Sequence, residues 1–292
     1  MDSNEKLLKA VKNNDLENVK DWIEQGADLH AKKDYTLRLA AAYGHLEVVK
    51  YLLEQGADLH AQNDDALRFA AERGHLEVVK YLVEQGANLH ADNDSALRLA
   101  AQRGNLEVVK YLVEQGANLH AADVRALQFA AYHGRLEVVK YLLEQGADLH
   151  DYNDGALRWA VEFGHLEVVK YLLEQGADLH AYDDKALRYA AERGHLEVVK
   201  YLVEQGADSD LITEPILVKL FTTYDPQVTK ITPRLSSLLL KIKFIKKPHK
   251  TSTRNKILST YSKQVVSSLV ILMYHLYYRP SGPGFFQAIE QI

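Results

Sequence analysis

Histidine is the residue type in this chain whose chemistry and spacing most invite a functional reading. The sequence contains thirteen histidines and no cysteine. Ten of the histidines recur at multiples of thirty residues, at positions 30, 60, 90, 120, 150 and 180 or 45, 75, 165 and 195. Histidine binds zinc and transfers protons near neutral pH. The ligands of one zinc ion must each lie about 2 Å from it, whereas neighbouring helices pack about 8 to 10 Å apart. One histidine per repeat is therefore a poor metal site, and we predict a structural role.

No other catalytic pattern stands out in the sequence. It contains no HExxH motif, and its carboxylates are spread along predicted solvated faces instead of facing one another as acid and base. The glycines of "PSGPGFF" (280–286) belong to no GxGxxG motif, so a phosphate-binding loop is unsupported. We predict no catalytic residue, no metal, no cofactor and no small-molecule substrate, and hence a protein that is not an enzyme.

The elements that carry these residues repeat every thirty positions. The phrase "GHLEVVKYLLEQGADLHA" (44–61) returns down the chain, and seven units fit, beginning near 1, 31, 61, 91, 121, 151 and 181. In one unit, "ALRFAAERG" (66–74) and "LEVVKYLVEQG" (76–86) read as two helices, each closed by a glycine, and "GANLHADND" reads as a short extended turn. The second helix has a predicted buried stripe of Leu76, Val79, Leu82 and Val83. Such hairpins must stack to bury their stripes.

The repeated segment resembles the second half of an ankyrin repeat. The resemblance covers roughly residues 1–210 and implies an all-α solenoid of stacked helix hairpins with short connecting turns. Ankyrin units usually have 33 residues and open with Thr-Pro-Leu-His, whereas these have thirty and read "DYTLR", "DDALR" or "DSALR". The thirty-residue variety is similar to the ankyrin repeat proteins of mimivirus-like giant viruses, which implies a viral protein. The family resemblance also implies protein–protein interaction through the turn tips and the concave helix face.

An aspartate precedes the first helix of most units, where it is expected to cap that helix in place of Thr and Pro. An arginine follows four residues later, and the one unit with Val124 instead of the aspartate also has Gln128 instead of the arginine. We therefore predict an ion pair within each unit, with chance drift as the alternative explanation. The paired positions are Asp34 and Arg38, Asp64 and Arg68, Asp94 and Arg98, Asp154 and Arg158, and Asp184 and Arg188.

Variation between the units is concentrated at the turn tips and just before the glycine that ends the first helix. Aromatic residues and arginine are typical anchors of protein interfaces, so these positions are the candidate partner-binding residues, with neutral drift as the alternative. They are Tyr43, Arg73, Arg103, Tyr132, His133, Tyr152, Phe163, Tyr182 and Arg193. The centre of the binding surface is predicted at Tyr132, His133, Tyr152, Phe163 and Tyr182. A separate apolar register is predicted to be core: Leu39, Phe69, Leu99, Phe129, Trp159 and Tyr189.

Three regions follow from these patterns: an N-terminal capping unit (1–30), six repeats (31–210) and a basic non-repeat region (211–292). Asn18 and Asp21 stand where other units have Val and Tyr, as an exposed end requires. The last region has twelve Lys and Arg against three Asp and Glu, a net charge of +9, whereas residues 1–210 have 23 against 37, a net charge of −14.

The basic region allows several interpretations. Its apolar run at 265–278 has fourteen residues, fewer than the about 20 that a spanning helix needs. The run could pack on the last repeat as a cap, or the region could dock on the acidic array. Alternatively, its lysines could bind anionic lipid or nucleic acid. These lysines are Lys241, Lys243, Lys246, Lys247 and Lys250.

The combined expectation is a non-enzymatic scaffold that binds an unidentified protein of the host or the virus. The alternatives are a peripheral membrane or nucleic-acid tether acting through the basic region, and a structural component of the virion. The lack of cysteine and the polar N-terminus predict a reducing, intracellular compartment. We expect the host cytoplasm, with the nucleus or the virion as alternatives.

Overall fold

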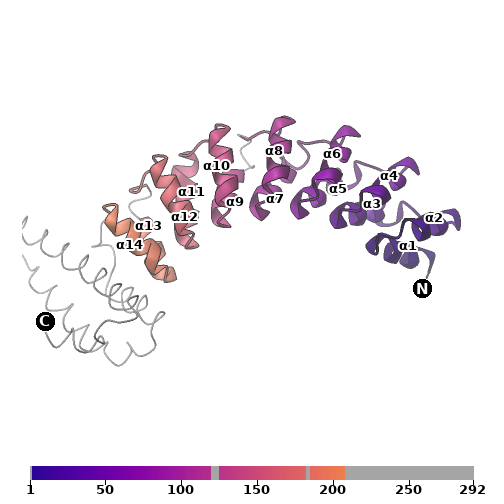
Figure 1. The fold of residues 1–292 in the computed structure, drawn as a ribbon, viewed down its shortest axis with the longest axis horizontal. Coiled ribbons are helices and arrows are strands. Elements are labelled where there is room, and N and C mark those ends of the chain that lie inside the picture. Colours follow the sequence, from indigo (N-terminus) through magenta and orange to yellow (C-terminus); the bar gives the residue numbers. More distant parts are fainter. Residues whose placement is uncertain (1, 120–124, 182–184, 208–292) are drawn as a thin grey trace, which may run out of the picture. The chain divides into compact units, whose positions relative to one another are not determined.

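The computed structural model describes residues 2–119, 125–181 and 185–207 of the chain (Figure 1). These residues form fourteen helices joined by short turns, and none of them lies in a β-strand. The predicted all-α fold of stacked helix hairpins is therefore confirmed. The basic region at 211–292 lies outside the described residues.

The chain divides into two compact units, Met1–Asp151 and Tyr152–Ile292. In the first unit the inner helices are α1 (Ser3–Lys12), α3 (Ala31–Tyr43), α5 (Ala61–Arg73), α7 (Ser95–Arg103) and α9 (Ala126–Tyr132). The outer helices are α2 (Leu16–Glu24), α4 (Leu46–Glu54), α6 (Leu76–Glu84), α8 (Leu106–Glu114) and α10 (Leu136–Glu144). Consecutive inner helices pack side by side, and each is joined to its own outer helix by a tight turn (Figure 1).

The second unit repeats the hairpin. Its helices are α11, whose first residue belongs to the first unit (Asp151–Glu162), α12 (Leu166–Glu174), α13 (Lys185–Arg193) and α14 (Leu196–Glu204). The division at 151/152 differs from the predicted boundaries at 30/31 and 210/211, which separate kinds of repeat and not compact units.

The core lies between the two helix rows. Val78, Val79 and Leu82 are buried in α6, whereas Leu76 and Val83 of the predicted stripe are half-buried. The stripe is displaced because an outer helix packs against its own inner helix and also against the neighbouring outer helices. At the N-terminal end Asn18 and Asp21 are exposed, as a capping unit requires.

The turn tips differ from the predicted extended conformation. Gln62, Asn63 and Asp64 all have left-handed backbone, with φ of 55°, 56° and 58°. The same conformation occurs at 32–34, 92–94 and 152–154. Left-handed backbone costs about 1 to 2 kcal/mol for an ordinary residue and less for Asn and Asp. The hydrogen bonds of the aspartate that ends each run offset this cost.

That aspartate does not cap its own helix as predicted. The Asp64 carboxylate is buried, accepts a hydrogen bond from the Asn88 N–H at 3.0 Å, and lies 2.9 Å from Nδ1 of His60. Asp34 and Asp94 make the equivalent contacts with His30 and His90. The carboxylate therefore joins the end of the preceding repeat to the far turn of its own repeat, and these histidines have the predicted structural role.

A second set of contacts links consecutive repeats at the opposite end of the inner helices. Nε2 of His75 donates to the Ala42 carbonyl at 3.0 Å, and Asn105 donates to the carbonyls of Ala71 and Glu72 at 2.9 Å. The carbonyls at the end of an inner helix have no partner within the helix. Each repeat therefore caps the inner helix of the repeat before it.

Candidate functional site

The predicted partner-binding residues lie where the inner helices end and at one turn tip. Among the described residues, Tyr43 and Tyr152 are the most exposed large apolar side chains, at 49% and 43%. The three arginines of this set are also exposed: Arg73, Arg103 and Arg193. The other three described members are half-buried: Tyr132, His133 and Phe163. Tyr182 lies outside the described residues. These side chains are thus presented along the inner-helix edge, on segments held by the bonds between repeats.

Two of the three arginines already have a partner in the chain. Arg103 pairs with Glu72 of the preceding repeat at 2.5 Å, and Arg193 pairs with Glu162 at 2.6 Å. In both cases the carboxylate stands 31 positions before the arginine. The pairs are partly exposed, and exposed ion pairs contribute little to stability, so these arginines are held in place without being buried.

Arg73 differs because Ala42 occupies the position of the carboxylate. No carboxylate among the described residues pairs with Arg73. The small side chain of Ala42 also leaves space between α3 and α5. A hollow of about 330 Å³ opens there, lined by Tyr35, Arg38, Leu39, Ala42, Tyr43, Phe69, Glu72 and Arg73.

The apolar register predicted as core is only partly buried. Leu39 is buried, but Phe69, Leu99, Phe129, Trp159 and Tyr189 are half-buried on the inner helices. Arginines cover several of the rings: the guanidinium of Arg68 lies 5.5 Å from the Phe69 ring and that of Arg98 lies 5.6 Å from the Phe129 ring. This geometry is that of a cation–π contact. The prediction of a core register is therefore wrong for five of the six residues, which form part of the surface.

Arg38 and Arg68 do not make the ion pair that the sequence predicts within their units. Arg38 donates to Asp65 at 3.0 Å and to the Lys32 carbonyl, and Arg68 contacts Asp65 and Asp92. The aspartates predicted as their partners, at 34 and 64, are instead engaged by histidine and backbone N–H groups. Val124, the exception that suggested the pairing, lies outside the described residues.

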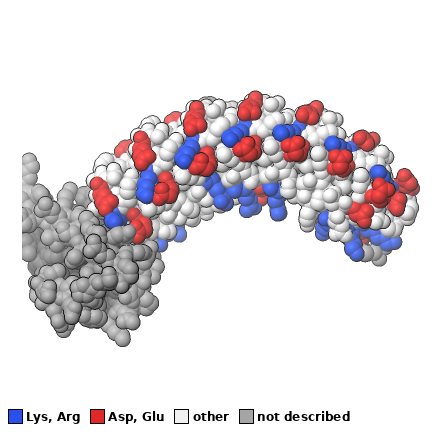
Figure 2. All heavy atoms as spheres, viewed as in Figure 1, with Lys and Arg blue, Asp and Glu red and all other residues white. Residues whose placement is uncertain are grey.

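The inner and outer faces of the first unit differ in charge pattern. On the outer helices each lysine pairs with a glutamate three residues earlier, as Lys50 does with Glu47 at 2.7 Å. The hydrogen bond to Glu47 raises the pKa of Lys50. Figure 2 shows this alternation of red and blue along the outer helices, and a gathering of blue on the side of α5, α7 and α9. The inner face is therefore the more basic of the two.

A second hollow in the first unit lies near the turn tips of α7 and α9. It is lined by Asp92, Asn93, Arg98, Arg125 and Phe129. Two guanidinium groups and one ring thus face a common space. The combination suits an anionic group next to an apolar one.

The second unit has its own aromatic cluster. Trp159 and Phe163 stack with ring centroids 6.1 Å apart, and Arg158 and Arg193 lie over these two rings at 5.8 and 5.9 Å. Phe163 is thus half-buried by a ring that the sequence assigned to the core.

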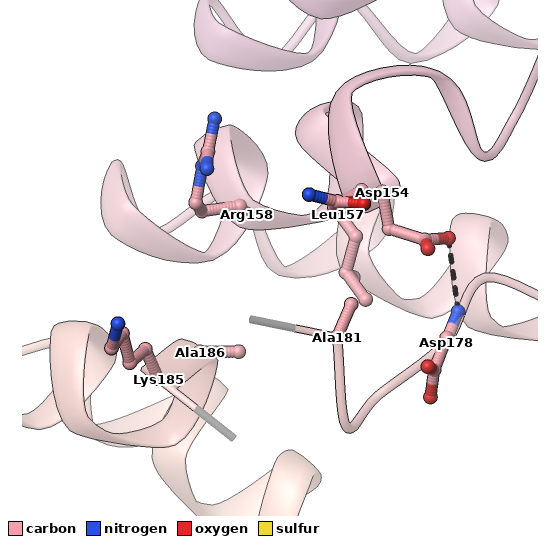
Figure 3. A pocket seen from close by; sticks show the side chains of 8 residues that line it. Asp154, Leu157, Arg158, Asp178, Ala181, Lys185 and Ala186 are labelled. Carbon is pink, nitrogen blue, oxygen red and sulfur yellow. Dashed lines mark hydrogen bonds between the residues drawn. The ribbon is translucent and has the colours of Figure 1, made fainter. Parts of the chain in front are cut away.

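The gap between α11 and α13 shown in Figure 3 is too small for a ligand. Asp154, Leu157 and Lys185 are among its lining residues, and its free space is about 10 Å³, roughly what one water molecule needs. The hydrogen bond drawn there, from the Asp178 N–H to Asp154 at 3.0 Å, is the second-unit counterpart of the bond at Asp64. The gap therefore belongs to the framework and not to a binding site.

Of the predicted centre of the binding surface, two described residues lie in the first unit and two in the second. The rings of Tyr132 and His133 lie 4.5 Å apart in the first unit. Tyr152 and Phe163 belong to the second unit. The first unit also contains the hollow at Ala42, which the sequence reasoning missed. Two features of the sequence could have indicated this hollow. Ala42 is the single alanine at its position in the repeat, where the other units have larger residues, and an arginine such as Arg38 recurs directly before the apolar residue at the position of Leu39.

The remaining predictions concern metals and the basic region. Residues 2–119, 125–181 and 185–207 contain no group of three or more His, Asp or Glu arranged to hold a metal ion. No helix in these ranges is long and apolar enough to cross a membrane. The lysines predicted to bind lipid or nucleic acid lie outside them.

Comparison with known families gives one result. A family model described as ankyrin repeats, in three copies, matches residues 7–93, 86–153 and 148–213. A search of curated proteins gave no match. The matched residues run from 7 to 213, span both compact units and include helices α2 to α14 and part of α1.

Proposed function

The chain belongs to the ankyrin repeat family, and from this premise we propose that it is a non-enzymatic scaffold that binds a protein partner. Ankyrin repeats are generally protein–protein interaction modules. The proposed contact surface consists of the inner-helix edge and the turn tips, where the candidate residues lie. The partner is a protein of the host or, if the chain is viral, of the virus.

The observation that carries the proposal is the exposure of interface-type residues on a hydrogen-bonded framework. Tyr43 is 49% exposed at the rim of a hollow, and arginines cover half-buried rings along the same face. Tyrosine and arginine supply much of the energy of protein interfaces. The bonds at Asp64 and His75 hold these residues at fixed spacing, so little conformational entropy is lost on binding.

Affinity capture with the full chain tests this proposal. The tagged chain and a Tyr43→Ala/Phe163→Ala double variant, one change in each unit, are used to capture proteins that are identified by mass spectrometry. We expect the double variant to capture at most about one-tenth of the amount of partner that the unaltered chain captures. The reason is that truncating an aromatic side chain that anchors an interface typically lowers the affinity several-fold to a hundred-fold. Far-UV circular dichroism checks that the helices remain.

The matched control is Lys80→Ala/Lys170→Ala, which alters one outer-helix pair in each unit. It should leave capture unchanged. Recovery of the same partner by the Tyr43→Ala/Phe163→Ala variant at full level would show that the inner face is not the contact surface. If, in that case, a chain that ends after residue 207 captured no partner, we would replace the scaffold function with the tether function of the basic region.

The lack of cysteine is the basis for proposing a reducing compartment as the place of action. Labelling the full chain in infected or transfected cells and scoring its position by microscopy tests this. Exclusive recovery from the culture medium would contradict it.

A further inference from the structure

The hollow between α3 and α5 joins an apolar surface to a cation that has no carboxylate partner. Leu39, Ala42 and Phe69 provide the apolar surface, and Tyr43 stands exposed at the rim. Arg73 is exposed, and none of the described carboxylates pairs with it. Binding sites commonly combine apolar walls with a few convergent polar groups. This hollow has that character: its lining includes Arg38 and Glu72, which pair with Asp65 and Arg103, and Arg73, whose positive charge no described carboxylate balances.

The neighbouring repeats show what Arg73 lacks. Glu72 and Glu162 each hold the arginine of the following repeat, at 2.5 and 2.6 Å. The equivalent position before Arg73 is Ala42, which has no carboxylate to offer. The chain itself thus demonstrates that a carboxylate placed at the level of Ala42 forms an ion pair with the arginine 31 positions later. Among the described residues none supplies that carboxylate to Arg73, so the position is open to a carboxylate of a ligand.

Further cations continue along the same face. Arg38, which pairs with Asp65, lines the first hollow, and Arg98 and Arg125 line the second hollow two repeats on, beside the Phe129 ring and Asp92. No carboxylate among the described residues pairs with Arg98, although its guanidinium covers that ring. A ligand that runs along the inner helices would therefore meet positive charge and apolar surface in alternation.

Resting on the proposed scaffold function, we infer that the inner face of the first unit binds an acidic, extended segment of the partner protein. A carboxylate of that segment pairs with Arg73, and an adjacent apolar or aromatic side chain enters the hollow beside Phe69. A second carboxylate pairs with Arg98. The partner is thus defined by its chemistry: acidic residues interspersed with large apolar ones.

Nucleic acid is the less suitable anion for this face. Residues 1–210 have a net charge of −14, which repels a nucleic acid, charged at every phosphate, more strongly than a segment with a few carboxylates. Glu72 and Asp92 also stand on the face and oppose a continuous row of phosphates. The rings of Phe69 and Phe129 are already covered by guanidinium groups, which leaves less ring surface for stacking bases. A segment with separated carboxylates avoids the two acidic side chains.

Fluorescence polarisation with defined probes tests the inference. The first probe is a labelled peptide in which Asp and Glu flank one phenylalanine. The comparison probes replace this phenylalanine with serine, or replace the acidic residues with lysine, or are a labelled oligothymidine. Each is titrated with the full chain at low and at physiological ionic strength.

Three variants of the full chain locate the site. Ala42→Glu supplies Arg73 with an internal carboxylate and fills the hollow, in the arrangement that Glu72 and Arg103 already have. Arg73→Glu reverses the charge. Lys110→Glu makes the same change in net charge on the outer helix α8 and is the matched control.

We expect the acidic phenylalanine peptide to bind the unaltered chain, and to bind about tenfold or more weakly to Ala42→Glu and to Arg73→Glu. Lys110→Glu should change its affinity less than about twofold, since exposed charges far from the site are screened. The serine peptide should bind the chain more weakly than the phenylalanine peptide does, and the lysine peptide and oligothymidine should bind more weakly still. Equal affinity for the unaltered chain and Ala42→Glu would overturn the inference, as would tighter binding of oligothymidine or no binding of the acidic peptide.

The outcomes separate this inference from the proposed scaffold function. If no acidic peptide binds while affinity capture still recovers a partner that the Tyr43→Ala/Phe163→Ala variant loses, the acidic segment is wrong and the scaffold function stands. If that capture is also insensitive to the inner-face changes, both are wrong.

Discussion

A single aspartate joins three segments of the chain in each of the repeats that begin near residues 31, 61 and 91. Asp64 meets the His60 ring, accepts from the Asn88 N–H and ends a left-handed run of three residues. Its side chain is buried, so the two contacts replace water that it would otherwise bind. The sequence indicated that this position matters but suggested a helix cap, because a cap and a contact between distant turns use the same residue type.

The contact predicts unequal effects of two substitutions at Asp64. Asp64→Ala removes the buried carboxylate, leaves the Asn88 N–H without its acceptor and should lower the free energy of unfolding by about 1 to 3 kcal/mol. Asp64→Asn keeps an acceptor oxygen and should lose less than about half of that. Urea unfolding of the full chain, followed by circular dichroism, measures both. An equally large loss for Asn and Ala would show that the acceptor is not what stabilises the turn.

At the scale of the element, the glycine that ends an inner helix has two reasons to be glycine. Gly74 has φ of +80°, and a Cβ there would lie 2.9 Å from Oδ1 of Asn105. That amide is held by two hydrogen bonds to the inner helix and is not free to move aside. Gly86, which ends the outer helix, has φ of +96° but nothing within 4 Å of the added atom.

Alanine at the two glycines therefore separates backbone strain from crowding. Gly86→Ala should cost about 1 kcal/mol, the price of left-handed backbone alone. Gly74→Ala should cost about 1 kcal/mol more, because it also displaces the Asn105 side chain. The comparison of unfolding midpoints measures the difference. Equal losses would mean that Asn105 moves without cost.

Much of the element structure follows from the sequence, because it depends on residues close together in the chain. The thirty-residue period, the paired helices and the glycines such as Gly74 and Gly86 are local features, and the structure confirms them. The left-handed tip that ends at Asp64 depends on His60 of the preceding repeat and on the distant Asn88 N–H, and Arg38 finds Asp65 in the following repeat. Spacing within one unit does not reveal these. The hollow at Ala42 was not predicted from the sequence for the same reason, since it forms only where two repeats pack side by side.

At the scale of the whole molecule, one repeat lacks the aspartate that links its two ends. Val124 occupies the position by register, although it lies outside the described residues. In the same repeat Ala147 is half-buried, whereas the equivalent Ala117 and Ala177 are 7% exposed. The boundary between the compact units follows at 151/152. By register, the repeat at 121–150 has no aspartate to accept the hydrogen bond that Asp64 and Asp94 accept in theirs.

Restoring the aspartate should strengthen that repeat. Val124→Asp offers an acceptor to the N–H of residue 148, as Asp94 does for residue 118. We expect a gain of about 1 kcal/mol in unfolding free energy, with a steeper transition. Val124→Ala serves as the control for loss of the valine side chain. A full-chain denaturation curve for Val124→Asp at or below that of Val124→Ala would contradict the expectation.

The bonds at Asp64 and His75 reach only into the adjacent repeat. A thirty-residue segment copied in tandem would consequently find both of its junctions already chemically compatible, with no new contact to invent. Duplication can thus lengthen the array in whole steps, and novelty can then arise by a single later substitution on one copy. Ala42, the one small residue among its larger counterparts, has the form of such a substitution: the inherited framework stays intact while one copy acquires a different ligand preference.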